Sequence, residues 1–175
     1  MKEKITMARK KKKEQNKQGT PLYYEGSITT EYTKNGVTIK KTTHNSGLRK
    51  LFELIGRSLS GENTSKEYPR FIVPFNVAYE NIDATHMLTA SFVPTTDIKW
   101  SATESSATVT MKFTIPYNFF TSSQDKIKCY VLFNSQNLES RCAFVDIAGN
   151  GDSIPDRGEN VVLSWKMTVG NKENS

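Results

Sequence analysis

The chain has 175 residues and a formal net charge of +6. This length suits one ordinary domain with a sizeable core and is short for two. No segment approaches the roughly 18 consecutive apolar residues of a membrane-spanning helix, and the first residues lack the apolar stretch of a secretory signal. We therefore expect a soluble protein that is made in a cytoplasm and makes no membrane contact.

The positive charge is concentrated at the N-terminus. Eight basic and two acidic residues lie in the first twenty, and the remaining 16 basic and 16 acidic residues cancel. Because residues 1–20 have almost no apolar side chains, they cannot bury enough surface to offset the entropy of ordering. We expect a disordered basic arm over 1–20 and a neutral domain over 21–175. The arm residues expected to contact an acidic partner or nucleic acid are Arg9, Lys10, Lys11, Lys12, Lys13 and Lys17.

A β-hairpin is predicted at the start of the domain. Asn35-Gly36 is the typical two-residue type I′ turn, because both turn positions need positive φ. This turn sets three pairs of residues opposite each other: Tyr32 with Ile39, Ile28 with Thr43, and Glu31 with Lys40. One face of the hairpin is then moderately apolar and the other is wholly polar, so we expect it to cover a core with one face only.

One amphipathic helix is predicted after the hairpin. Asn45 or Ser46 can cap its start, and Gly61 is a natural residue to end it. Its apolar residues recur with helical spacing and should form the buried stripe: Leu48, Leu51, Phe52, Ile55 and Leu59.

The rest of the chain is predicted to form strands. Apolar and polar residues alternate cleanly over 108–115 and 160–169. Weaker strand candidates are 70–79, 87–93, 127–133 and 141–147, and Pro74 within the first of these indicates an edge or a bulge. With the hairpin this gives about eight strands and one helix. The fold class is therefore mainly β, a β-sandwich or jelly-roll-like domain with a disordered basic N-terminal arm.

No catalytic motif is present. The two cysteines, Cys129 and Cys142, lie in apolar strand patterns that are typical of buried, inert thiols. The segment 146–152 is rich in Gly, Asn and Asp but lacks two oxygen ligands of a calcium loop, and we interpret it as a long hairpin connection. We therefore expect no catalytic residue, no metal, no cofactor and no small-molecule substrate.

The order of features resembles small virion structural proteins of tailed bacteriophages over about residues 24–171. A turn with His44, Asn45 and Gly47 precedes a helix that contains Leu51-Phe52, and the domain closes on a strand with Trp165 and Asn171. The resemblance implies a non-enzymatic structural component of the virion that packs against other virion proteins and forms a homo-oligomer. Head decoration, fibre anchoring, collar and tail positions all stay open.

The nearest alternative is a nucleic-acid-binding protein or a small coat protein that uses the basic arm to bind the genome. Cations on a flexible tether bind phosphates without sequence preference and with strong salt dependence. The arm has no aromatic side chains to stack on bases, so any nucleic-acid contact should be non-specific.

Overall fold

The computed structural model describes residues 22–45, 49–120, 126–137, 139, 141 and 143–171. The elements in this part of the chain are β1 (Leu22–Lys34), β2 (Val37–Asn45), α1 (Arg49–Leu59), β3 (Phe71–Phe75), α2 (Ala84–Leu88), β4 (Val93–Ala102), β5 (Ser106–Pro116), β6 (Lys126–Phe133), β7 (Ala143–Ser153) and β8 (Asn160–Asn171), with short 3-10 turns at Tyr79–Asn81 and Tyr117–Phe119.

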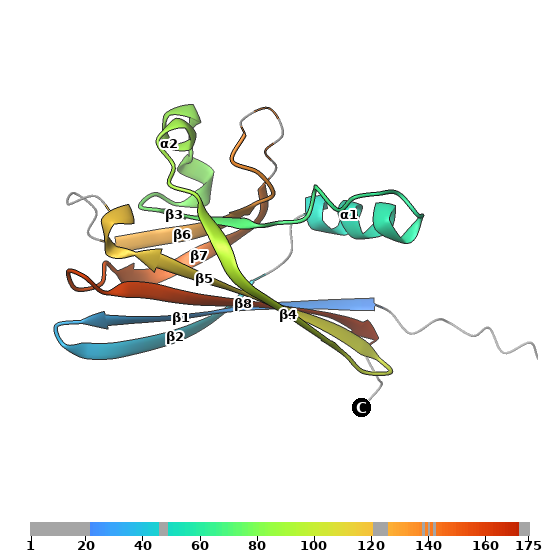
Figure 1. The fold of residues 1–175 in the computed structure, drawn as a ribbon, viewed down its shortest axis with the longest axis horizontal. Coiled ribbons are helices and arrows are strands. Elements are labelled where there is room, and N and C mark those ends of the chain that lie inside the picture. Colours follow the sequence, from blue (N-terminus) through green and yellow to red (C-terminus); the bar gives the residue numbers. More distant parts are fainter. Residues whose placement is uncertain are drawn as a thin grey trace, which may run out of the picture.

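The strands form two antiparallel sheets that share β4. Their order is β2-β1-β8-β5-β4-β3-β6-β7. The start of β4, Val93 and Pro94, pairs with β3. From Thr95 onward the strand pairs with β5 instead, with an irregularity between Thr95 and Asp97. The first sheet is therefore β2-β1-β8-β5-β4 and the second is β4-β3-β6-β7, and the predicted β-sandwich-like fold is confirmed (Figure 1).

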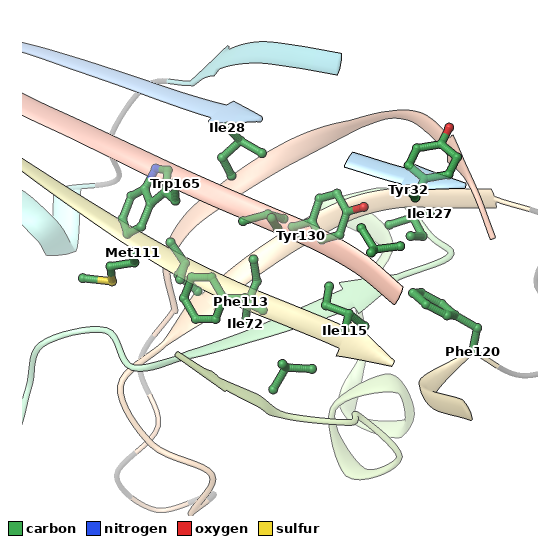
Figure 2. Close-up of a cluster of buried hydrophobic side chains, with 14 of the residues drawn as sticks. Ile28, Tyr32, Ile72, Met111, Phe113, Ile115, Phe120, Ile127, Tyr130 and Trp165 are labelled. Carbon is green, nitrogen blue, oxygen red and sulfur yellow. The ribbon is translucent and has the colours of Figure 1, made fainter. Parts of the chain in front are cut away.

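The core lies between the two sheets and is built from the alternating strands. Phe113 and Ile115 of β5 and Leu163 and Trp165 of β8 are completely buried. Figure 2 shows Trp165 and Phe113 among core side chains from both sheets. The two clean alternating runs of the sequence therefore form strands, as predicted, and their apolar faces line the core.

The hairpin follows the prediction closely. Asn35 and Gly36 have φ values of 53° and 71°, as a type I′ turn requires. Tyr32 pairs with Ile39, and Tyr32 is buried on the inner face. The Asp156 carboxylate accepts a hydrogen bond from the Gly36 backbone N–H at 3.0 Å, which ties the turn to the loop before β8. Backbone donors at Gly36 and Asn35 hold the pKa of Asp156 below its ordinary value.

The predicted helix exists, but its buried face is partly wrong. Gly61 ends α1 with a φ of 91°, as expected. Leu54, which lies outside the predicted stripe, is only 2% exposed, whereas Phe52 is 48% and Leu59 is 80% exposed. Phe52 instead meets the ring of Tyr24 edge-on at 5.6 Å. The core contacts only one side of α1, so its buried face is rotated from the centre of the apolar stripe toward Leu54.

Three other local predictions need correction. The strand predicted over 87–93 is wrong, because residues 84–88 form α2, started by an Asp83 capping box. The hairpin connection predicted over 146–152 is also wrong, because β7 continues through it to Ser153. The prediction of a single helix is wrong as well, because α2 is a second helix. Pro74 does lie where β3 has an open side, since β4 pairs only with Phe71 and Ile72.

Candidate functional site

The residues singled out in the sequence do not gather into one site within the described part of the chain. Arg9, Lys10–Lys13 and Lys17 of the arm, together with Gly47 and Cys142, lie outside it, so their roles stay predictions. His44 and Asn45 end β2, opposite Ser27 and Gly26. Asn171 ends β8, opposite Leu22. Trp165 is fully buried in the core, whereas His44 is exposed and its Nδ1 lies 3.9 Å from Glu25 Oε1.

The described cysteine and the second histidine make local structural contacts. Cys129 is 1% exposed, and its thiol donates to the Val77 carbonyl at 3.2 Å. His86 completes the α2 capping box, where its backbone N–H donates to Asp83 Oδ1 at 2.9 Å. Hydrogen bonds from His86 lower the pKa of Asp83.

No three His, Cys, Asp or Glu side chains within the described ranges come close enough together to hold a metal ion. None of the helices in those same ranges is long and apolar enough to cross a membrane.

A buried polar cluster joins the two ends of the strand order. Asp152 on β7 is 1% exposed, and Tyr130 of β6 donates to its Oδ2 at 3.1 Å. Lys41 Nζ of β2 lies 3.5 Å from Asp152 Oδ1. The Ser153 backbone N–H also donates to the hydroxyl of Tyr32 at 3.1 Å. The cluster therefore links β2 to β7, the outermost strands of the order, and so connects the two sheets along these strands.

Stability should fall at alkaline pH because of Tyr130. Burial, followed by the charge of Asp152, raises the pKa of Tyr130 well above its ordinary value of 10. Above about pH 10 the unfolded chain loses the tyrosine proton and the folded chain keeps it, so this contribution is complete below pH 10 and declines above it. The free energy of unfolding should therefore decrease by up to about 1.4 kcal/mol for each pH unit above pH 10.

Urea unfolding between about pH 9 and pH 11 measures this slope. In Tyr130→Phe, the decrease of the free energy of unfolding with pH should be smaller by up to about 1.4 kcal/mol per pH unit. Tyr79→Phe, at a side chain that is 37% exposed, is the matched control and should leave the slope unchanged. Equal slopes for the wild-type chain and Tyr130→Phe would contradict this assignment.

The clearest candidate for an interaction site is the open side of β4 between Asp97 and Ala102, which we call the β4 edge. This segment pairs with β5, and among the described residues β3 pairs only with the start of β4. Figure 1 shows β4 and β5 extending past the second sheet at this end. The β4 edge therefore offers backbone donors and acceptors that no described strand uses.

Two large apolar side chains lie on the β4 edge. Ile98 is 51% exposed and Trp100 is 78% exposed. They stand directly opposite Met111 and Val109 of β5, and Met111 is buried in the core. Since directly paired residues share one face of a sheet, Ile98 and Trp100 continue the core-facing side of the first sheet into solvent.

The β4 edge was missed in the sequence, although a signal for it exists. Ile98 and Trp100 alternate with Asp97, Lys99 and Ser101 in the strict period-2 pattern of a strand. The predicted strand over 87–93 stopped just before this pattern. An exposed tryptophan within a predicted strand would have indicated a contact surface.

Comparisons of the chain with protein-family models, with curated proteins and with solved structures found no match.

Proposed function

We propose that the chain is a non-enzymatic structural component of a tailed-phage virion that packs against other virion proteins. The observation that carries this proposal is the β4 edge, where Trp100 is 78% exposed on a strand that pairs with β5 on one side and with no described strand on the other. Soluble monomers normally protect such edges and avoid exposed apolar side chains next to them. An edge of this kind is typical of a surface that a partner covers after assembly.

Two further features support a role in assembly. The outer face of the first sheet carries threonine pairs, with hydroxyl contacts of 2.9 Å between Thr29 and Thr42 and between Thr108 and Thr168. The order of motifs also resembles that of small virion structural proteins, with head decoration, fibre anchoring, collar and tail positions all compatible.

The test is incorporation into particles of the phage that encodes the chain. After density-gradient purification, quantitative mass spectrometry should find the chain at a fixed copy number relative to the major capsid protein. A Trp100→Lys chain expressed in its place should be depleted from the particles. Recovery of the wild-type chain only in the soluble lysate would contradict a virion role.

A second candidate function is non-specific nucleic-acid binding through the basic arm. The observation that favours it is the charge distribution, since the whole net charge of +6 lies in the first twenty residues. A basic arm on a neutral domain is a simple device for neutralising phosphates.

DNA binding over a salt series tests this candidate with the full chain. Replacing Lys10, Lys11, Lys12 and Lys13 by Ala should reduce the slope of log K against log salt by about 0.9 for each lost phosphate contact. The matched control removes four exposed lysines of the domain, Lys40, Lys99, Lys126 and Lys128, and should change the slope little. If the wild-type chain fails to bind DNA at low salt, the nucleic-acid candidate falls.

A further inference from the structure

The hydrogen-bond pattern of the β4–β5 hairpin fixes which backbone groups of β4 point outward. The Thr103 N–H donates to the Ser106 carbonyl at 2.8 Å. In an antiparallel pair, residues that bond to the neighbouring strand alternate with residues that do not. The residues that bond to β5 are therefore Asp97, Lys99, Ser101 and Thr103. The residues whose N–H and C=O groups point to the open side are Ile98, Trp100 and Ala102.

The regular part of this edge is short and centred on Trp100. It begins at Asp97, just after the irregularity between Thr95 and Asp97, and it ends at Ala102, because the chain turns toward β5 from Thr103. Trp100 is the middle one of the three residues whose backbone groups point to the open side. A two-fold axis at Trp100 would therefore use all of the regular edge and none of the irregularity.

We infer that the β4 edge pairs antiparallel with the same edge of a second copy, with Trp100 opposite its counterpart. This register also sets Ile98 opposite Ala102 of the other copy, so that all the outward backbone groups are matched. This pairing joins the first sheet of one copy to the first sheet of the other, so that they form one continuous sheet across a typical isologous interface. The inference deepens the proposed function by naming one partner, and its biological meaning rests on that function.

Charge disfavours one of the neighbouring registers, and the other neighbouring registers extend beyond the regular part of the edge. Lys99 lies on the other face of the strand, with its Nζ 3.4 Å from Asp97 Oδ2. A shift of the two-fold axis by one residue toward the N-terminus would oppose Lys99 to Lys99, which destabilises a strand pair. A shift by one further residue would set Lys99 opposite Asp97, but it would also set Trp100 opposite Thr96, within the irregular part of β4. A shift of the axis by one residue toward the C-terminus would set Ile98 opposite Glu104, in the turn between β4 and β5. In the inferred register Lys99 faces the uncharged Ser101.

The side chains at the centre of the interface also suit a second copy. Trp100 and Ile98 are the large exposed apolar residues of β4, and on pairing they would lie in the middle of the new sheet. Aromatic residues at the centre of an interface contribute most of the binding energy. Cross-strand aromatic pairs add to the stability of antiparallel sheets.

Sedimentation of the purified full chain over a concentration series tests the inference. The wild-type chain should show a reversible monomer–dimer equilibrium. Trp100→Lys should weaken dimerisation at least about 30-fold, the loss expected for a central aromatic residue. Val37→Lys makes a comparable change at a residue that is 61% exposed at the hairpin turn, and it should dimerise like the wild type.

A second variant separates backbone pairing from apolar contact. Ala102→Pro keeps Trp100 but removes an outward N–H, and proline is tolerated at such positions of an edge strand. It should weaken dimerisation while the far-ultraviolet circular dichroism spectrum stays unchanged. A wild-type chain that is monomeric at all concentrations, or a dimer that Trp100→Lys leaves intact, would overturn the inference.

Tryptophan fluorescence reports directly on the edge. The chain has two tryptophans, so Trp165→Phe leaves Trp100 as the only one. Its emission should be red-shifted and quenchable by acrylamide in dilute solution, and it should become blue-shifted and protected as dimers form. Emission that is already blue-shifted and protected in the monomer would show that another segment of the same chain covers the edge, and would also overturn the inference.

These outcomes can be told apart from failure of the proposed function. A monomeric chain that is nevertheless incorporated into particles would remove the β4 pairing and leave the virion role standing. A dimer that is absent from particles would keep the pairing and remove the virion role.

Discussion

Replacing Trp165 by Ala is expected to lower the free energy of unfolding by about 3–5 kcal/mol. Trp165 is fully buried, and it pairs with Ile28 on one side and Met111 on the other, at the centre of the first sheet. Figure 2 shows it in the core beside these two residues. Truncation there leaves a large cavity that both sheets line, and a loss of this size is a large part of the total stability of a typical domain.

Two matched variants make this prediction specific. Trp165→Phe should cost clearly less than Trp165→Ala, because it keeps most of the volume and removes an indole N–H that has no acceptor among the described residues. Trp100→Ala makes the same change at an exposed residue and should stay within about 0.5 kcal/mol in dilute solution. Urea unfolding of the three variants gives the comparison. Equal losses for Trp165→Ala and Trp100→Ala would contradict the burial of Trp165.

Replacing Lys41 by Met is expected to cost about 2–4 kcal/mol. The change leaves the buried Asp152 carboxylate without the cation that lies 3.5 Å away, and removing one partner of a buried ion pair typically costs about 3–5 kcal/mol. The range is lowered because the Lys41 side chain is 34% exposed, so water already screens part of the interaction. Urea unfolding at neutral pH measures the loss.

The neighbouring lysine supplies the control. Lys40 lies on the outer face, 3.8 Å from Glu31, and both side chains are more than half exposed. Lys40→Met should therefore change stability by less than about 1 kcal/mol. The double variant Lys41→Met with Asp152→Asn should lose less than the sum of the two single variants, because neither charge is then left alone. Strict additivity would show that the two residues are not coupled.

The parts of the fold that were predicted correctly depend on local rules. Turn chemistry at Asn35-Gly36 fixes the hairpin register, and a strict period of two marks β5 and β8. The errors arise where tertiary structure decides. The face of α1 that is buried depends on how the helix lies over the sheets. β7 continues past Gly149 and Gly151 because β6 pairs with it on both sides of an irregularity there, at Ala148 and at Asp152.

The candidate site was hardest to predict because an edge is a property of the whole sheet. That Trp100 lies on an open edge follows only from the strand order, in which β3 pairs with β6 and leaves the side of β4 from Asp97 onward without a described partner. Trp165 lies in the last strand, as the alternating pattern predicted, and its side chain is buried in the core.

Hydrogen–deuterium exchange of the β4 edge, in the free chain and in purified particles, tests the central claim most directly. The amides of Ile98, Trp100 and Ala102 point to the open side, so they should exchange fast in the dilute chain and slowly in particles that contain it. The amides of Lys99 and Ser101 bond to β5 and should be protected in both states. Fast exchange of the outward amides in the particle, or absence of the chain from it, would contradict assembly through this edge.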